Sequence, residues 1–281
     1  MRLATVDIAG QHTVVDVVEF EDGRGRGRVL ADGCVGQLLG RGDLSSVLGD
    51  ATAAQHGAAA TPRGMVEFTS AQLLPVVPRP GKIFCVGLNY REHIQEMGHE
   101  IPEHPTLFAK YASALAAPFA QVNLPAALGQ QADYEGELAV VVGAGGRVAG
   151  YAVMNDFSQR DWQYRTQQWL QGKNADASSA FGPWLTPAQE VDPVADGATL
   201  RTWVNGELRQ EHSVSDLVFP PAELVEYISQ FARLEPGDVI VTGTPEGVGH
   251  GMKPPRYLAD GDEVRISIEG LGEVSSTVRM G

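Results

Sequence analysis

Apolar residues and turn-forming residues alternate along most of the chain in short runs, a pattern typical of β-strands. Residues 1 to about 70 contain several such runs between glycine-rich turns. Beyond residue 81 the same alternation predicts strands at 82–87, 134–142, 148–154, 200–204, 239–242 and 263–268. Asn205-Gly206, which follows one of these runs, is a strong signal for a hairpin turn. The pattern therefore predicts an α+β protein in which strands dominate.

Helical periodicity is clearest at 221–231. Pro221 stands in the predicted first turn, and apolar residues at 224, 225, 228 and 231 lie on one helical face. The Glu-Pro-Gly sequence at 235–237 predicts the end of this helix.

A proline-rich segment divides the chain. Three prolines lie within 75–80, which excludes a helix and predicts a stiff, extended connection. The residues before this segment offer few candidates for chemistry. We therefore predict a small, β-rich N-terminal accessory domain over 1–74 and a catalytic domain over 75–281.

The charge balance limits the classes of partner. Lysine and arginine number 21 and aspartate and glutamate 35, which gives a formal charge of −14. Binding to nucleic acid or to an anionic membrane requires a basic surface, so both are disfavoured. Cys34 and Cys85 are too few for a disulfide framework, and no apolar run approaches the ~18 residues of a membrane span. We expect a cytoplasmic protein whose partners are small molecules, metal cations or other copies of itself.

Two carboxylates lie two residues apart at the start of a predicted strand. Side chains alternate along a strand, so Glu135 and Glu137 project from the same face, roughly 6.5–7 Å apart. A solvated strand face is the ordinary interpretation of a bare Glu-x-Glu. The run at 138–142 is continuously apolar, however, as in a buried strand, where unpaired carboxylates are costly. This context favours a metal-binding or ion-paired role.

A third carboxylate follows the next predicted strand. The turn at 143–147 would join the two strands as an antiparallel hairpin, which brings Asp156 close to Glu135 and Glu137. An all-oxygen set suits Mg²⁺ or Mn²⁺, with Ca²⁺ as a third candidate, and argues against zinc. The glycines of this turn do not match a dinucleotide-binding loop, because Val148 stands where the third glycine belongs.

A histidine and a glutamate three residues apart form a candidate general-base pair. On a helical turn, His93 and Glu96 lie on one side, where the carboxylate can orient the imidazole. An ordinary surface pair is the competing interpretation. Lys173 after Gly172, and Thr244 within Thr-Gly-Thr-Pro, suggest by themselves only a solvated charge and a turn.

Together these segments resemble the fumarylacetoacetate hydrolase family, among its shorter members related to acylpyruvases, oxaloacetate decarboxylases and homoprotocatechuate-pathway isomerases. The resemblance extends from about residue 70 to the end. It rests on motifs in the family's order: Gly87-Leu88-Asn89-Tyr90 with His93 and Glu96, Leu107-Phe108-Ala109-Lys110, Asp133-Tyr134-Glu135-Gly136-Glu137, Asn155-Asp156 with Ser158, Arg160 and Asp161, Gly172-Lys173, Gly182-Pro183-Trp184, Thr242-Gly243-Thr244-Pro245, and Leu258 to Val264.

The resemblance implies a mixed β-roll catalytic domain, a bound Mg²⁺ or Mn²⁺ and a homodimer. It also implies a role for each matching residue. Glu135, Glu137 and Asp156 would be the metal ligands, and His93 with Glu96 would form a water-activating dyad on a lid. Lys173 would be the cation beside the oxyanion. Arg160, Gln163 and Thr244 would contact the substrate.

The expected reaction follows from this set. We predict metal-dependent hydrolysis of a C–C bond in a 2,4-dioxo acid of the acylpyruvate or fumarylpyruvate type, because a complete His93/Glu96 dyad is most useful when water must be activated. Oxaloacetate-type decarboxylation and isomerisation of a 2-hydroxy-diene-dioate are alternatives on the same site, and a catalytically idle or scaffold-binding protein is a further one. Ala175 stands where the family often has a bulky aromatic residue, which predicts a reshaped substrate pocket.

Overall fold

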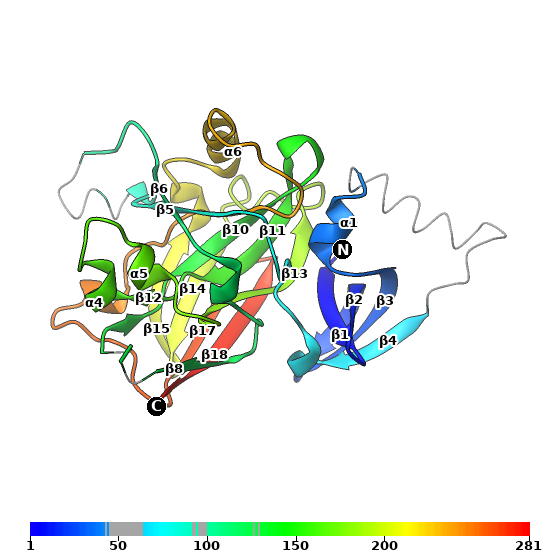
Figure 1. The fold of residues 1–281 in the computed structure, drawn as a ribbon, viewed down its shortest axis with the longest axis horizontal. Helices are drawn as coiled ribbons and strands as arrows, with labels where there is room; N and C mark the ends of the chain where they lie inside the picture. Colours follow the sequence, from blue (N-terminus) through cyan, green and yellow to red (C-terminus); the bar gives the residue numbers. More distant parts are fainter. Residues whose placement is uncertain (43, 45–63, 92–93, 95–99, 126, 129) are drawn as a thin grey trace.

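The computed structural model describes residues 1–42, 44, 64–91, 94, 100–125, 127, 128 and 130–281 (Figure 1). The N-terminal part is an antiparallel meander that includes one short helix. Its elements are β1 (Leu3–Ile8), β2 (Gln11–Glu21), β3 (Arg24–Asp32), α1 (Val35–Leu39) and β4 (Met65–Thr69).

One large sheet joins this meander to the rest of the protein. Its strand order within the described residues is β4-β3-β2-β1-β13-β11-β10-β16-β5-β6, with β7 also paired to β13. Leu3 of β1 lies opposite Leu185 of β13, so backbone pairing continues across the predicted boundary at 74/75. The division into two domains at that point stays a prediction. The further strands of this sheet are β5 (Ile83–Gly87), β6 (Thr106–Ala109), β7 (Leu115–Ala116), β10 (Gly136–Val142), β11 (Val148–Asn155), β13 (Ser179–Pro187) and β16 (Val239–Val241).

Two smaller sheets complete the β structure. The five-stranded sheet has the order β15-β14-β17-β18-β8, and β12 pairs with β9 in a short ladder near the site described below. These strands are β8 (Gln121–Leu124), β9 (Ala132–Asp133), β12 (Ser158–Gln159), β14 (Thr199–Val204), β15 (Glu207–Ser213), β17 (Glu263–Ile268) and β18 (Gly272–Met280). Short helices connect them: α4 (Arg160–Gln163), α5 (Leu170–Lys173) and α6 (Pro221–Ser229), with 3₁₀ turns at Ser70–Gln72, Ala112–Ala114, Ala144–Gly146, Val214–Asp216 and Gly249–Gly251.

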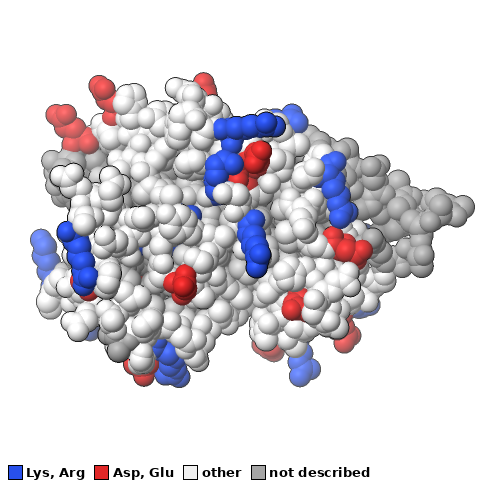
Figure 2. All heavy atoms as spheres, viewed as in Figure 1, with Lys and Arg blue, Asp and Glu red and all other residues white. Residues whose placement is uncertain are grey.

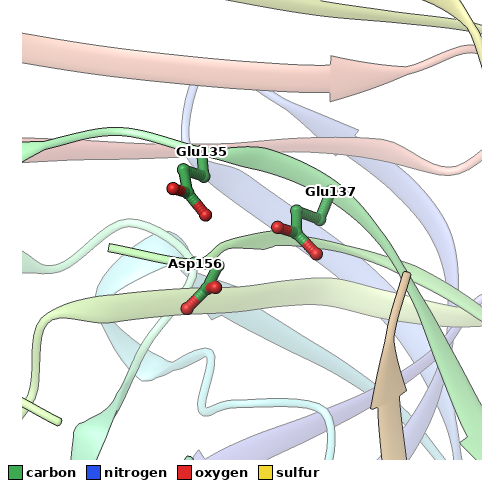
Figure 3. Close-up of side chains that lie close together, drawn as sticks. All are labelled: Glu135, Glu137 and Asp156. Atoms are coloured by element: carbon green, nitrogen blue, oxygen red, sulfur yellow. The ribbon is translucent and has the colours of Figure 1, made fainter. Parts of the chain in front are cut away.

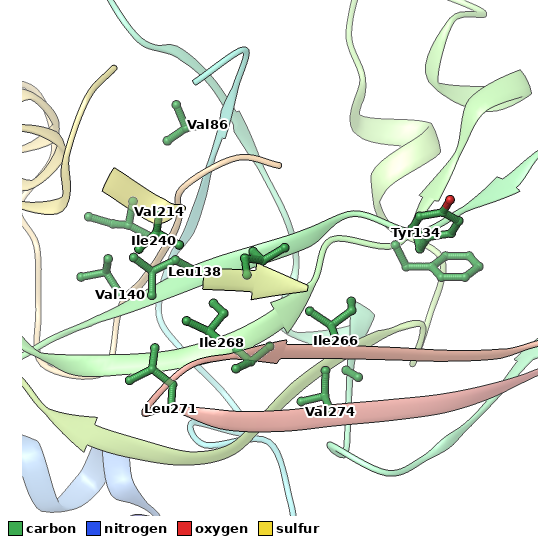
Figure 4. Packing of buried hydrophobic residues seen from close by; sticks show 14 of the residues in the cluster. Val86, Tyr134, Leu138, Val140, Val214, Ile240, Ile266, Ile268, Leu271 and Val274 are labelled. Carbon is green, nitrogen blue, oxygen red and sulfur yellow. The ribbon is translucent and has the colours of Figure 1, made fainter. Parts of the chain in front are cut away.

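The main hydrophobic core lies between the large sheet and the five-stranded sheet (Figure 4). Leu138 and Val140 of β10 contribute from one side, and Ile266 and Ile268 of β17 from the other. The opposite face of β10 packs into a second core with Val141 and its neighbours, so every residue of this strand is buried. Burial on both faces explains the continuous apolar run in the sequence. The arrangement confirms the predicted β-dominated mixed roll.

The predicted strands and hairpin agree with the structure to within one or two residues. Asn205 and Gly206 have φ values of 51° and 79°, as the turn between β14 and β15 requires. The predicted helix is α6, with Leu224 and Ile228 buried. The predicted helix extended to 231, whereas α6 ends at Ser229 and the Phe231 side chain beyond it is 62% exposed.

The surface carries charged side chains of both signs. On the face that Figure 2 shows, basic side chains are scattered among acidic ones instead of gathering into one field. Among the helices described, none has the length and apolar character needed to cross a lipid bilayer.

Candidate active site

The β10–β11 hairpin brings three carboxylates together. Gly136 pairs with Asn155 in the antiparallel register, and the Asp156 amide donates a hydrogen bond to the Glu135 carbonyl at 2.9 Å. One carboxylate oxygen from each of Glu135, Glu137 and Asp156 lies within 4.8 Å of the others (Figure 3). All three residues are buried. The convergence predicted from the hairpin is confirmed.

Two buried lysines compensate part of this negative charge. Lys173 Nζ lies 2.5 Å from Glu135 Oε2 and 2.7 Å from Asp156 Oδ2. Lys110 Nζ lies 2.5 Å from Asp156 Oδ1 and also donates to the carbonyls of Phe157 and Lys173. Lys110 therefore fixes a carboxylate and the backbone of the second lysine together. Sequence reasoning did not assign it a role, although its Leu-Phe-Ala-Lys motif was part of the family resemblance.

The two lysines affect the pKa values of the carboxylates to different extents. Burial alone would raise the pKa of Asp156, but Lys110 and Lys173 outweigh it and hold that pKa at about 2. Burial, together with Asp156 and Glu135, raises the pKa of Glu137 well above its usual value. Glu137 Oε2 accepts a hydrogen bond from the Gly243 amide at 2.5 Å. A divalent cation would relieve this repulsion, and the all-oxygen donor set fits Mg²⁺ or Mn²⁺.

The helices α4 and α5 hold the other expected residues beside the carboxylates. Arg160 Nη1 lies 2.5 Å from Glu135 Oε1 and donates to Gln163 Oε1 at 3.0 Å. A Cβ atom at Gly172 would stand 2.4 Å from the Gln163 amide nitrogen, so only glycine allows this close approach of α5 to α4. The approach places Lys173 next to the Arg160–Gln163 pair.

Thr244 reaches the same region from the loop after β16. Its hydroxyl donates to the Gly136 carbonyl at 2.9 Å and accepts from Gln210 Nε2 at 2.8 Å. His93 and Glu96 lie outside the described residues, so the dyad stays a prediction.

A cavity of about 190 Å³ is lined in part by Glu135 and Glu137. This volume is smaller than the roughly 300–1,000 Å³ of pockets for drug-sized ligands, which favours a small substrate. Ala175 is buried in the core and does not line this cavity, so its expected effect on the pocket shape stays a prediction. The walls combine the site residues with apolar and aromatic side chains: Val86, Gly87, Leu88, Phe108, Glu135, Glu137, Arg160, Gln163, Tyr164, Trp169, Lys173, Thr244, Val248, His250 and Gly251.

Methionine at position 110 is expected to destabilise the metal-free protein. The Lys110 side chain is fully buried against Asp156, and removing one partner of a buried ion pair typically costs about 3–5 kcal/mol. Denaturant titration of Lys110→Met against the wild type measures this loss. Lys253→Met, at an exposed position, serves as the control. A free energy of unfolding equal to that of the control would contradict the assigned role of Lys110.

Comparisons with known proteins find relatives over most of the chain. Residues 82–279 match the fumarylacetoacetate hydrolase C-terminal family. A mitochondrial oxaloacetate tautomerase of Homo sapiens is 39% identical, with 99% of this chain and 91% of the relative covered. An oxaloacetate tautomerase of Bacillus subtilis is 40% identical over 76% of this chain and 75% of its own.

Solved structures of related proteins have a similar fold. A fumarylacetoacetate hydrolase from Exiguobacterium antarcticum superposes with a TM-score of 0.82 at 33% identity, and a 5-carboxymethyl-2-hydroxymuconate delta-isomerase from Mycobacterium smegmatis with 0.76 at 30%. Both similarities cover all of this chain and all of the other. The related proteins thus carry names of tautomerases, isomerases and hydrolases.

Proposed function

The chain belongs to the fumarylacetoacetate hydrolase family of enzymes that act on keto acids, and on this basis we propose that it interconverts the enol and keto forms of oxaloacetate. The observation that carries the proposal is the similarity to oxaloacetate tautomerases over nearly the whole chain. In this reaction the proton of the enol hydroxyl leaves and a proton joins C3, with no bond between carbons broken. The comparisons thus favour an isomerisation over the C–C hydrolysis that the sequence pattern suggested.

The proposed metal ligands are Glu135, Glu137 and Asp156. When bound there, Mg²⁺ or Mn²⁺ supplies a Lewis acid that polarises the 2-oxo group of the substrate. The raised pKa of Glu137 supports this ligand set, because the folded protein favours a cation or a proton beside that carboxylate.

Lys173 is proposed to stabilise the negative charge that develops on the C2 oxygen. Burial alone would lower the pKa of Lys173, but Asp156 and Glu135 outweigh it and raise that pKa above its usual value. The ammonium group therefore keeps its proton and acts as a fixed cation. Arg160, Gln163 and Thr244 are proposed to orient the substrate from the cavity wall.

The reaction also needs a group that removes a proton from C3 in one direction and returns it in the other. His93 oriented by Glu96 is the proposed base, on the sequence pattern alone, since both residues lie outside the described part of the chain. A homodimer and a cytoplasmic location stay predictions.

The test compares three reactions of the same preparation with Mg²⁺, with Mn²⁺ and with EDTA. We expect metal-dependent loss of enol oxaloacetate at a rate well above that of buffer with metal alone. Pyruvate release from acetylpyruvate and CO₂ release from oxaloacetate are expected to be at least about tenfold slower. A protein that releases pyruvate or CO₂ but does not accelerate the enol–keto exchange would contradict the proposal.

Hydrolysis of a C–C bond is the second candidate function. It is favoured by the 33% identity and complete coverage shared with the fumarylacetoacetate hydrolase from Exiguobacterium antarcticum. The acetylpyruvate assay decides between the two.

A further inference from the structure

One terminal nitrogen of Arg160 has no partner although it is buried. The residue is 4% exposed, and its Nε and Nη1 atoms contact Asp133, Glu135 and Gln163. Nη2 is buried without a hydrogen-bond partner in the described structure. An unpaired buried guanidinium nitrogen is costly, and here it belongs to a side chain that lines the cavity. Because the Arg160 side chain lines the cavity, the unpaired Nη2 indicates an acceptor on the ligand.

Asp133 ties this guanidinium to the turn on the other side of the cavity. Asp133 Oδ2 accepts hydrogen bonds from Arg160 Nε at 2.8 Å and from the His250 amide at 2.9 Å. Its Oδ1 accepts from the amides of Tyr134 and Gly249 at 3.0 and 2.8 Å. The carboxylate is completely buried. The same buried carboxylate therefore fixes the position of the Arg160 guanidinium and of the turn that carries His250.

The His250 imidazole stands at the mouth of the cavity, between two tyrosines. Its Nδ1 lies 2.8 Å from the Tyr257 hydroxyl, and its ring centroid lies 5.4 Å from that of Tyr164. With Nδ1 engaged by Tyr257, Nε2 is the nitrogen left for a ligand. Burial lowers the pKa of His250, and the positive Arg160 nearby lowers it further. An anion bound between these two groups would meet the positive charge of Arg160 and an N–H donor of the neutral His250 ring.

We propose that Arg160 Nη2 and His250 form a subsite for a second carboxylate of the substrate, the one at the end away from Glu135, Glu137 and Asp156. His250 is then a specificity-determining residue that selects 2-oxo dicarboxylates over monocarboxylates of equal length. The inference rests on the proposed function in one respect, namely that a 2-oxo acid occupies this cavity. Arg160 supplies planar charged donors, and His250 supplies a donor whose orientation Tyr257 fixes.

Two unreactive probes of equal length test the subsite by binding alone. Malate carries a carboxylate where 2-hydroxybutyrate carries a methyl group, and both present a 2-hydroxy acid to the metal centre. In calorimetry with the Mn²⁺-loaded protein, we expect malate to bind at least about tenfold more tightly. The variant His250→Phe should lose most of this preference, through weaker malate binding with 2-hydroxybutyrate binding unchanged. Tyr257→Phe should lose part of it.

The control is His104→Phe. His104 is also exposed and stacks on the Tyr227 ring at 5.9 Å, but it does not line this cavity. Equal affinities for the two probes in the wild type, no malate binding, or an equal loss for both probes in His250→Phe would each overturn the proposal. Because neither probe reacts, a protein without tautomerase activity can still show the preference, and an active tautomerase can lack it.

Discussion

Glutamine in place of Glu137 is expected to reduce Mn²⁺ affinity by more than about 100-fold and to abolish metal-dependent activity. Loss of a group outside the ligand set typically costs 10–100-fold in metal affinity, so loss of a charged ligand should cost more. Glutamine keeps the shape of the side chain and an oxygen that can accept from the Gly243 amide. The change therefore removes charge and leaves the local geometry in place. Calorimetric titration with Mn²⁺ measures the effect.

The same substitution should stabilise the metal-free protein. The raised pKa of Glu137 means that its ionised form is disfavoured by folding, so wild-type stability falls as the pH rises above the ordinary carboxyl value. Glutamine removes that penalty. We expect a higher melting temperature at neutral pH, and no difference at acidic pH, where Glu137 is protonated in the folded and the unfolded protein. Glu226→Gln, at an exposed position of α6, is the control. Unchanged Mn²⁺ affinity in Glu137→Gln would contradict the ligand assignment.

Methionine in place of Lys173 should also lower activity, but it should leave metal binding in place. The ammonium group lies between Glu135 and Asp156, so its loss leaves those carboxylates more negative and Mn²⁺ binding is expected to persist. The turnover number is expected to fall by at least about 100-fold, because a fixed charge near the developing oxyanion is worth that much in comparable sites. Parallel calorimetry and enol-oxaloacetate assays separate the two effects.

The Lys173→Met prediction has a clear point of failure. Activity within about tenfold of the wild type, with Lys253→Met as the reference, would show that the cation does not stabilise the reaction. Loss of metal binding together with activity would instead make Lys173 a structural residue of the site. Either result would contradict the proposed catalytic role of Lys173.

The carboxylate cluster was predictable because it depends on local rules. Alternation along one strand, a five-residue turn and antiparallel pairing are enough to bring Asp156 to Glu135 and Glu137, and the structure has this register. The continuous apolar run of β10 was also a local signal, and it correctly predicted a strand that is buried on both faces.

The remaining partners depend on contacts that spacing does not reveal. Lys110 meets Asp156 across 46 positions, and Asp133 meets the His250 amide across 117. Both contacts join loops or strand ends from separate parts of the fold, and one buried lysine resembles any other charged residue in the sequence. The helix end was placed two residues too late for a different reason: the apolar period continues past the point where α6 ends.

The most direct test of the account is an anomalous-scattering map at the manganese edge from crystals equilibrated with MnCl₂. We predict one strong peak bound by carboxylate oxygens of Glu135, Glu137 and Asp156, and its absence from crystals of Glu137→Gln. A peak at another set of residues, or an empty cluster in the wild type at saturating Mn²⁺, would contradict the claim that these three carboxylates form the metal centre.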